Sequence, residues 1–547
     1  MPAALDVPVL VVGAGPTGMA ASILLGLQGV ASLVVERRAA PQRAPAAHVV
    51  NARTFEILRA AGVDMARVAA ACRPPADAGA VRWVATLAGE ELGSLPFEQQ
   101  GDDVLAATPT PLRNLSQHRL EQILLDHLRT QPNADLRYAH EWESAEQDAA
   151  GVTSRVRDLA TGETRVVRSR WLLAADGAGS PVRKSLGIEP IGPPRLASFV
   201  MIHFAADLRA IVRDRPGVLY FVSDPRARGV FVAHDIDREW VFMHPWEPER
   251  ERAEDYGASR CAEIVRTALG SAVPPFTVQT IATWHMSVQV AERYRGGRAF
   301  LVGDAAHRFP PTGGLGLNTG VQDAHNLAWK IAAVEHGSAA PALLESYEQE
   351  RKPVAQQNAE ASARNAAKLL EVAQALGPEG DGDRAAVRAA VANQAEHFDM
   401  LGLQLGFRYE RGALVADGTP PPRVANPVRE YVPCARPGAR LPHAWTERGG
   451  ARASTLDLLP VDRFTVIVGR RGDAWLDATA KLDAPFARLA IGRDVRDEDG
   501  AWTLALGIGD DGALLVRPDQ HVAWRAARGA ADPEAVLREA FARVLGR

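Results

Sequence analysis

The chain begins with a hydrophobic pattern that predicts a β-α-β unit. The β-branched run from Val7 to Val12 is typical of a short buried strand. A glycine-rich turn follows it, and the apolar stretch from Pro16 to Leu27 predicts a helix. Ala31 to Val35 predicts a second strand, which ends at Glu36. This order of elements is the building block of a parallel sheet.

Further along, the hydrophobic pattern changes twice. From about Pro190 to Trp284, short apolar runs alternate with polar turns, which predicts an antiparallel sheet inserted into the first domain. On both sides of this insert the pattern predicts helices and buried strands. Helical periodicity predicts a helix over Gln117–Arg129 and helices between Val321 and about Leu370, and short apolar runs predict strands over Trp171–Ala174 and Ala299–Val302. Asp417 to Arg440 is rich in proline and glycine, so we expect a linker there.

After the linker, the pattern predicts a smaller α/β unit. Its expected strands are Phe464–Val468, Ala487–Ile491 and Leu514–Val516, and its last helix should begin after Asp532 with Pro533 in the first helical position. We therefore predict an α/β protein with a Rossmann-like domain, an inserted antiparallel sheet and a C-terminal α/β domain. The expected boundaries are 1–80, 101–189 and 290–375 for the first domain, 81–100 and 190–289 for the insert, 376–423 for a helix and linker with a turn at Gly377–Gly382, and 424–547 for the C-terminal domain.

Composition and charge narrow the function classes. The 547 residues are too many for one ordinary core. The formal net charge of -4 gives no general attraction for nucleic acid or anionic lipid, so we expect neither as a partner. Three widely spaced cysteines suggest neither a disulfide framework nor a zinc site, and we predict no metal. With no secretory pattern and no apolar run of the ~18 residues that a membrane helix needs, the expected location is cytoplasmic.

Candidate chemistry starts at the first glycine turn, which lies between a strand and a helix. There, Gly13 permits a tight turn, Gly15 lets the backbone approach a pyrophosphate, and Gly18 allows the helix to pack closely on the strand. Glu36 ends the next strand, where a carboxylate can accept hydrogen bonds from ribose hydroxyls. In this context we predict a dinucleotide site, whose expected residues are Gly13, Gly15, Pro16, Thr17, Gly18, Glu36 and Arg37.

Two further motifs belong with the first. One is Ala175-Asp176-Gly177 after the predicted strand at 171–174. The other is Gly303-Asp304 after a strand, followed by a glycine-rich loop that leads into a helix at Gly316-Leu317-Asn318. Asp304 can bind the ribityl chain of a flavin. Backbone N–H groups at Leu317 and Asn318 can face the flavin pyrimidine, with the positive end of the helix dipole near N1 and O2 of the ring.

These three motifs in this order resemble the single-component aromatic hydroxylases, the flavoprotein family that includes para-hydroxybenzoate and phenol hydroxylases. The resemblance covers about Val7 to Leu370 and implies bound FAD, NADPH or NADH as co-substrate, O₂, and a small aromatic substrate. Residues near Arg436–His443 and Leu515–Asp519 are similar to the tail of the phenol hydroxylase branch, which is a thioredoxin-like domain. The chain has no Cys-x-x-Cys, so we expect no thiol redox activity there. A homodimer is compatible with this resemblance.

The resemblance also assigns single residues. Gln117 matches a glutamine near the flavin ribityl chain, Arg43 a residue near the flavin and the nicotinamide, and Pro310 a proline beside the isoalloxazine. The stretch His48–Thr54 resembles the chlorophenol and phenol hydroxylase branch. Some relatives carry an aspartate in place of His48 that acts on the phenol hydroxyl. His48 is therefore the candidate base, and a packed or capping histidine is the other interpretation.

In such an enzyme NAD(P)H reduces the flavin, and O₂ then forms a C4a-hydroperoxide that oxygenates the ring. Two alternatives stay open, a Baeyer–Villiger or tailoring oxygenase acting on an aromatic polyketide and a flavin-fold binding protein without turnover. On the inserted sheet, five residues could line the substrate pocket from one face only, His203, Tyr220, His234, Met243 and Trp246. We expect a structural hydrogen bond at His307, an ion pair or a loop anchor at Arg183, and an ion pair from Arg53 to Glu36 or Glu56.

Overall fold

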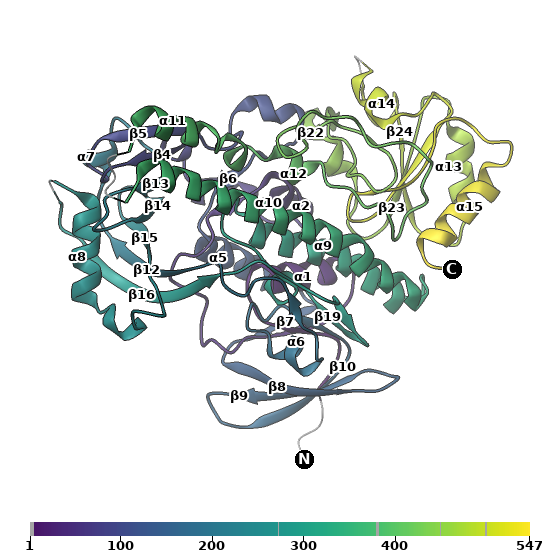
Figure 1. Cartoon of the computed structure of the whole chain (residues 1–547). Coiled ribbons are helices and arrows are strands. Elements are labelled where there is room, and N and C mark those ends of the chain that lie inside the picture. The colour runs from purple at the N-terminus through teal and green to yellow at the C-terminus, as the bar shows by residue number, and fades with distance from the viewer. Residues whose placement is uncertain (1–4, 272, 379–381, 449, 498–499) are drawn as a thin grey trace.

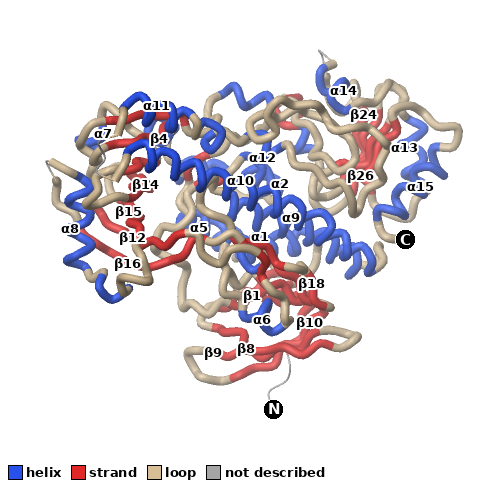
Figure 2. The backbone as a smooth tube through the Cα atoms, viewed as in Figure 1, coloured by secondary structure: helices blue, strands red, loops and turns tan. Residues whose placement is uncertain are grey.

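The computed structural model describes residues 5–271, 273–378, 382–448, 450–497 and 500–547. Its strands gather in three main groups that helices connect (Figure 2). The α/β architecture expected from the sequence is confirmed, with a mainly parallel sheet, an inserted antiparallel sheet and a C-terminal α/β domain. The predicted turn at Gly377–Gly382 lies in part outside the described residues.

The first group is a sheet built around a fully buried parallel core. Its central strand β1 (Leu5–Val12) pairs in parallel with β2 (Ser32–Val35) and with β10 (Thr164–Ala174). The other strands are β7 (Ala134–Arg137), β19 (Ala299–Leu301), β18 (Arg295–Gly296), β8 (His140–Gln147) and β9 (Val152–Asp158). Because β1, β2, β10 and β19 are parallel, their carboxyl ends lie along one edge, where the three motifs follow.

Helices cover this sheet and link it to the rest of the molecule. α1 (Pro16–Leu27) has the predicted bounds and is apolar on nearly all sides, because it packs against both α5 (Gln117–Leu128) and α9 (Leu315–Glu335). α9 and the long α10 (Ser346–Leu376) cross the middle of the molecule (Figure 1). Shorter helices are α2 (Ala52–Ala60), α3 (Met65–Ala71), α4 (Pro75–Ala78) and α6 (Pro181–Ser185).

The second group is a seven-stranded sheet in the order β16-β12-β15-β14-β13-β4-β5. Its strands are β4 (Ala80–Val84), β5 (Glu91–Pro96), β12 (Ala197–Ala205), β13 (Leu219–Val222), β14 (Gly229–Asp235), β15 (Glu239–Pro245) and β16 (Thr277–Met286). One face carries an apolar cluster with α8 (Ala258–Leu269), a helix that the sequence pattern did not predict. At the other end, α11 (Arg384–Ala392) and the end of α10 pack on β4 and β5, while α7 (Arg209–Val212) lies in the β12–β13 connection.

Two small sheets lie between the first two groups. β3 (Val49–Val50) pairs with β6 (Arg113–Asn114), so the segment that holds His48 is fastened to the segment that leads into α5. The backbone N–H of Leu115 also donates to the His48 carbonyl at 2.8 Å. The other small sheet contains β11 (Pro190–Ile191), β17 (Gln289–Ala291) and β20 (His307–Arg308).

The C-terminal domain has thioredoxin-like topology. β23 (Phe464–Val468) is parallel to β24 (Phe486–Ala490), and β25 (Ala513–Val516) is antiparallel to β23, with β26 (Val522–Ala526) on the outside. Its helices are α13 (Asp473–Ala480), α14 (Ala501–Leu506) and α15 (Pro533–Val544), and the hairpin β21 (Trp445–Arg448) and β22 (Ala451–Ser454) precedes them. Asp532 caps α15 as predicted. Between α12 (Leu401–Leu405) and β21 the chain forms no helix or strand, in agreement with the predicted linker.

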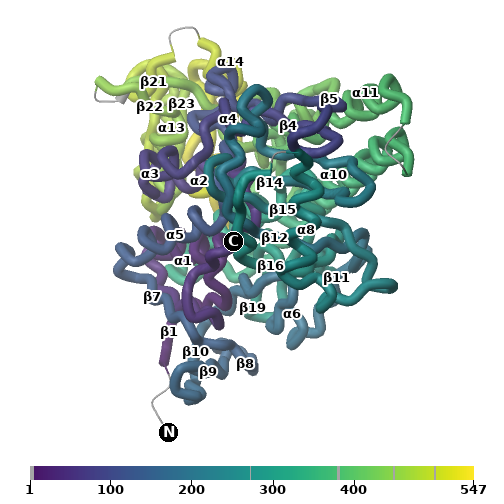
Figure 3. Tube along the Cα trace, turned by 90° about the vertical axis from the view of Figure 1, so that its left-hand side faces the viewer, coloured from purple at the N-terminus to yellow at the C-terminus, as the bar shows by residue number. Residues whose placement is uncertain are grey.

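Buried ion pairs join this domain to the first one. Arg517 contacts Glu350 on α10 at 2.8 Å and pairs with Asp519, and all three side chains are fully or almost fully buried. Arg440 likewise pairs with Glu56 on α2, which also holds Arg53 at 3.0 Å. Figure 3 shows α2 and α3 directly beside the C-terminal domain. The two domains are therefore parts of one tightly packed body.

Candidate functional site

The glycine turn after β1 contains three glycines. Packing within the protein leaves no room for a side chain at two of them, Gly13 and Gly18, but leaves room at Gly15. A Cβ at Gly13 would lie 2.3 Å from the Ala175 carbonyl oxygen, and one at Gly18 would lie 1.9 Å from the Gly13 oxygen. Gly13 also has a φ of 103°, a conformation that favours glycine. A Cβ at Gly15, however, would meet no protein atom within 4 Å. Gly15 therefore faces open space at the N-terminus of α1, where a pyrophosphate would bind.

Glu36 is held rigidly beside this turn. Its carboxylate accepts hydrogen bonds from the backbone N–H of Ala14 at 2.9 Å and from the backbone N–H of Arg38 at 2.9 Å. Burial would raise the pKa of Glu36, but the Arg38 guanidinium and these two N–H groups outweigh it and hold the pKa below its usual value. Glu36 is thus an ionised acceptor next to the helix N-terminus, and Arg37 beside it is exposed.

Gly303 and Asp304 lie at the carboxyl end of β19, where they meet α1. A Cβ at Gly303 would lie 2.8 Å from the hydroxyl oxygen of Thr17, and this close approach fixes the distance between the first and third motifs. The Asp304 side chain is accessible to solvent. The protein atoms packed around its carboxyl group nevertheless raise its pKa, because desolvation disfavours the charged form. A Cβ at Gly316 would lie 3.9 Å from this carboxylate, so the start of α9 is close to Asp304.

The N-terminus of α9 is placed by a glycine in the left-handed region. Gly314 has a φ of 62°, and a Cβ there would lie 2.5 Å from the Cβ of Val49. The backbone N–H groups of Gly316 and Leu317 find no acceptor within the described residues, as expected for the first turn of a helix. They are therefore free to bind an electron-rich group of a ligand, and Pro310, just upstream, is buried.

Asn318 ties this helix to the segment that carries His48. Its side-chain oxygen accepts from the Asn51 backbone N–H at 2.9 Å, and its side-chain nitrogen donates to the Val49 carbonyl at 2.9 Å. The sequence pointed to the Asn318 backbone as a flavin contact but gave no sign of this side-chain role. The loop that would face the flavin ring and the loop with the candidate base are therefore fixed relative to each other.

The remaining predicted cofactor residues differ in their surroundings. Asp176 accepts from the Val182 backbone N–H at 3.1 Å, but its Oδ1 is buried without a partner among the described residues, and burial raises its pKa. Gln117 donates to Glu121 at 2.8 Å. Arg43 is exposed and forms no ion pair within the described part of the chain. Geometry therefore brings together the glycine turns, Glu36, Asp304 and α9, and leaves Arg43 at the surface.

His48 is half-buried and points to the polar junction between the two large sheets. Its Nδ1 lies 2.9 Å from the side-chain oxygen of Asn114, which was not predicted as a site residue. Burial lowers the pKa of His48 and the hydrogen bond to Asn114 opposes this only in part, so the ring is neutral at neutral pH. With Nδ1–H donating to Asn114, Nε2 is the nitrogen that can accept a proton.

The structure resolves which face of the inserted sheet points toward His48. Tyr220 and Trp246 belong to the apolar cluster under α8 and lie on the opposite face. His234 contacts the His48 ring edge to face, with ring centroids 5.7 Å apart. His203 and Met243 share the His48 side, because neighbouring residues of a strand alternate between faces. Half-buried apolar side chains that the sequence analysis missed share that side, Phe199, Met201, Phe221 and Trp284.

The alternation of residues along β12 could have identified Phe199 and Met201. Val200 and Ile202 are buried in the core, so Phe199 and Met201 must point to the opposite face, toward His48.

Three other expectations concern structural residues. His307 bonds Asp323 at 2.7 Å, Arg183 donates to the Ala305 carbonyl at 3.1 Å, and Arg53 pairs with Glu56, while Glu36 pairs with Arg38.

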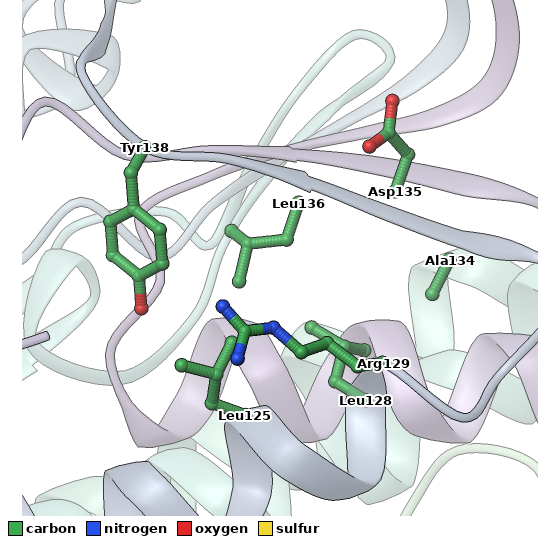
Figure 4. A pocket seen from close by; sticks show the side chains of 7 residues that line it. All are labelled: Leu125, Leu128, Arg129, Ala134, Asp135, Leu136 and Tyr138. Atoms are coloured by element: carbon green, nitrogen blue, oxygen red, sulfur yellow. The ribbon is translucent and has the colours of Figure 1, made fainter. Parts of the chain in front are cut away.

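A separate cavity of about 210 Å³ lies at the far end of α5, against the edge strand β7 (Figure 4). In it, Arg129 extends toward Tyr138 and Leu125, and Asp135 points away. The 12 residues of α5 place it about 18 Å from Gln117, at the end that does not adjoin His48. It is therefore distinct from the candidate site. In the described part of the chain, no helix is long and apolar enough to cross a membrane, and no acidic, histidine and cysteine residues are grouped to hold a metal.

FAD fits this site on three features of the protein itself. Gly15 leaves open space at a helix N-terminus, Asp176 has a buried oxygen without a partner, and the first N–H groups of α9 are free. Each feature suits a different part of a flavin dinucleotide, namely phosphate, hydroxyl and ring carbonyl groups.

Comparison with known proteins gives matches along almost the whole chain. Residues 6–362 match the family described as "FAD binding domain", and residues 435–547 match "Aromatic-ring hydroxylase, C-terminal". The chain is 38% identical to the tetracenomycin B2 monooxygenase-dioxygenase of Streptomyces olivaceus, over 99% of each chain. It is 34% identical to the 2,4-dichlorophenol 6-monooxygenase of Delftia acidovorans, over 99% of this chain and 98% of that protein.

Solved structures give the same result. The flavin-dependent monooxygenase PieE, in complex with FAD and substrate, superposes with a TM-score of 0.92 at 38% identity, covering 99% of both chains. An aklavinone-11 hydroxylase in a ternary complex with FAD and aklavinone superposes with a TM-score of 0.85 at 35% identity, covering 100% of both.

Proposed function

The chain belongs to the family of FAD-dependent aromatic-ring hydroxylases, and we propose that it hydroxylates a phenolic substrate with O₂, using NADPH or NADH as the reductant. Bound FAD supplies the redox chemistry and the activated oxygen. The protein's tasks are to hold the cofactor, to exclude water from it, and to move the proton of the substrate hydroxyl.

We assign cofactor binding to the edge where the parallel strands end. Gly15 and the N-terminus of α1 would hold the pyrophosphate, Glu36 the ribose hydroxyls, and Asp304 the ribityl chain. The free N–H groups of Gly316 and Leu317 would favour negative charge on the reduced ring, because they lie at the positive end of α9. Arg43 and Arg37 are exposed near this edge, where a nicotinamide nucleotide can reach them.

His48 is the residue to which we assign the substrate proton. The observation that carries this role is its neutral ring, with Nδ1 held by Asn114 and Nε2 free to accept. Removing the proton from a phenol of pKa ~10 makes its ortho and para carbons nucleophilic. Even an imidazole of ordinary pKa is a weaker base than a phenolate, so the transfer is uphill by about 5 kcal/mol and has to be coupled to oxygen transfer or to onward passage of the proton.

Two substitutions test His48, His48→Ala and His48→Gln. Both should retain FAD, measured by the flavin absorbance of the purified protein. At neutral pH, hydroxylation should fall by about 100-fold or more, and the loss should shrink as the pH approaches the pKa of the phenol itself. A loss that is the same at every pH, or no loss, would return His48 to a structural role.

The overall reaction has its own test. NAD(P)H oxidation should be slow without an aromatic compound and much faster with a suitable phenol, with one hydroxylated product per NAD(P)H consumed. Stopped-flow flavin absorbance and product analysis measure the two. A broad panel of phenols that yields no oxygenated product would refute the proposal.

One observation favours a second candidate, a tailoring oxygenase acting on a polycyclic aromatic polyketide. Half-buried apolar side chains extend over several strands on the His48 side of the sheet, from Trp284 on β16 through Met243 on β15 to Phe221 on β13. Trp284 and Phe221 are four strand spacings apart, and at about 4.8 Å per spacing this distance exceeds the width of one phenol ring. Including three- and four-ring phenols in the panel distinguishes the candidates, and a lactone or ring-opened product would identify Baeyer–Villiger chemistry.

A further inference from the structure

Four histidines from different parts of the chain converge beside the candidate site. His48 precedes β3, His118 lies in the first turn of α5, His203 is on β12, and His234 is on β14. His234 is 2% exposed and His203 is 5% exposed. Beyond them lies Glu239, the first residue of β15, whose side chain is 16% exposed. The mechanism above uses only His48, so the other three require an explanation.

The contacts place His48 beside His234, and place His203 and His118 beside Glu239. The His48 and His234 rings meet edge to face, and the hydroxyl of Ser116 holds His234 Nδ1 at 2.7 Å. Nε2 of His203 and Nε2 of His118 each lie 3.6 Å from the same oxygen of Glu239. Separations slightly beyond hydrogen-bond length are ones that a single water molecule can bridge.

In the described part of the chain, two of these histidines have buried ring nitrogens without a hydrogen-bond partner. Among the described residues, neither ring nitrogen of His203 has a hydrogen-bond partner, and Nδ1 of His118 has none, although all three atoms are buried. Buried polar atoms are nearly always paired, because an unpaired one costs free energy of about 1–3 kcal/mol. Among the same described residues, the buried histidines His307, His443 and His521 each have one unpaired nitrogen and one that is bonded, whereas both nitrogens of His203 are unpaired. Free imidazole nitrogens in a row are what successive proton transfers require.

The charges around the cluster prevent it from storing a proton. Burial, followed by repulsion from His48, His118 and His203, holds the pKa of His234 well below its ordinary value. Burial also lowers the pKa of His118. At the outer end, Glu239 stays ionised, since His203, His118 and Arg119 outweigh the effect of burial and lower its pKa. The nearby charged groups also include Asp235, which contacts Arg119, Arg73 and Arg238.

We propose that His234, His203 and His118 form a proton-transfer path that connects His48 to the partly exposed Glu239. The inference rests on the proposed function, because the proton it carries is that of the substrate hydroxyl. The O–H bond of the phenol breaks, His48 Nε2 takes the proton, and the path releases one proton to Glu239 or to the solvent beside it. No electron moves along the path. Because the proton leaves His48 along the path, the unfavourable pair of protonated His48 and phenolate does not have to accumulate.

The test compares His234→Gln with the wild-type enzyme on two phenols, one of pKa ~10 and one acidic phenol that is already ionised at neutral pH. If the path exists, the variant should lose about tenfold or more in hydroxylation of the first phenol at pH 7 and retain its rate with the ionised phenol. The loss with the first phenol should also disappear as the pH approaches 10. Flavin absorbance and the KM for the phenol should stay close to wild type.

The matched control is His285→Gln. His285 lies on β16 of the same sheet, is bonded to Ser198 at 2.9 Å, and belongs to a different part of the sheet from the path. It should leave both rates unchanged. If His234→Gln does not accumulate as a yellow, folded protein, His203→Gln tests the same path under the same comparison.

The outcomes separate the two proposals. Equal losses with both phenols, or losses that do not depend on pH, in the path variants would overturn the path and leave the hydroxylase proposal standing. A wild-type enzyme that oxygenates neither phenol nor any larger phenol would refute the hydroxylase proposal itself. A loss confined to the un-ionised phenol supports the path, since a structural defect would affect both substrates alike.

Discussion

Glu98 gives the sharpest quantitative prediction, because a buried carboxyl group there supports the wall of the site. It lies after β5, and one carboxyl oxygen accepts from the Met400 backbone N–H at 3.0 Å and from the Gln404 side chain at 3.1 Å. Gln404 in turn accepts from the backbone N–H of Ala52, at the start of α2. Glu98 also has a φ of 53°, a costly conformation for a residue other than glycine.

Burial raises the pKa of Glu98 from 4.5 to about 8, and Asp399 adds to this effect. Between these two pH values the folded protein binds a proton at Glu98 that the unfolded chain does not. The contribution to stability is therefore complete below pH 4.5 and declines as the pH rises through 8. A shift of about 3.5 pKa units corresponds to a decline of roughly 5 kcal/mol, of which about 3 kcal/mol falls between pH 5.5 and 8.5.

Glu98→Gln removes the titration and keeps a similar shape. Its free energy of unfolding, measured by urea denaturation with tryptophan fluorescence, should therefore rise relative to wild type by about 3 kcal/mol from pH 5.5 to pH 8.5. Glu410→Gln is the control. Arg436 holds the pKa of Glu410 below its usual value, so this variant should show no such slope above pH 5.5. Parallel pH dependence in wild type and Glu98→Gln would refute the assignment of a raised pKa.

Three further predictions concern the cofactor site and the domain junction. Gly15→Val should give a folded but colourless protein, because the new side chain meets no protein atom and occupies the space for the pyrophosphate, and a normal flavin spectrum would contradict this. Gly314→Ala should weaken FAD binding, measured by flavin fluorescence on dilution, since its Cβ would clash with Val49. Arg517→Met should lower the free energy of unfolding by roughly 3–5 kcal/mol, since Glu350 and Asp519 lose their buried partner, and urea denaturation with a loss below ~1 kcal/mol would argue against it.

Local signals in the sequence were sufficient for several elements of the first and C-terminal domains. The bounds of α1 follow from Pro16 at its start and the apolar run up to Leu27, and the start of α15 follows from Asp532 and Pro533. In each case the residues that determine the structure are neighbours in the chain. The contact of Gly18 with Gly13 is of the same kind, whereas Gly13 itself lies against Ala175 of the second motif, which is distant in the sequence.

The substrate half depended on contacts between distant residues. His48 and Asn114 are 66 positions apart, and Ser116 and His234 are 118 apart, so no local pattern indicates that they meet. The strands β8 and β9 were missed for another reason. Much of β8 is exposed and carries polar residues on both faces, so it lacks the alternation that identifies a half-buried strand.

The hydrogen bonds of the Asn318 side chain hold the proposed cofactor residues and the proposed substrate residues in one fixed arrangement. The proposed flavin contacts on α9 and the candidate base His48 belong to segments about 270 residues apart, yet the two hydrogen bonds of Asn318 to Val49 and Asn51 join these segments directly. The close approach of Gly314 to Val49 leaves no room for the segments to slide. Since oxygen transfer needs the substrate ring and the flavin in a fixed relation, this contact sets the reaction geometry. The variable part of the site is then the far side of the pocket, the inserted sheet, where substrate size can be altered without disturbing the flavin or the base.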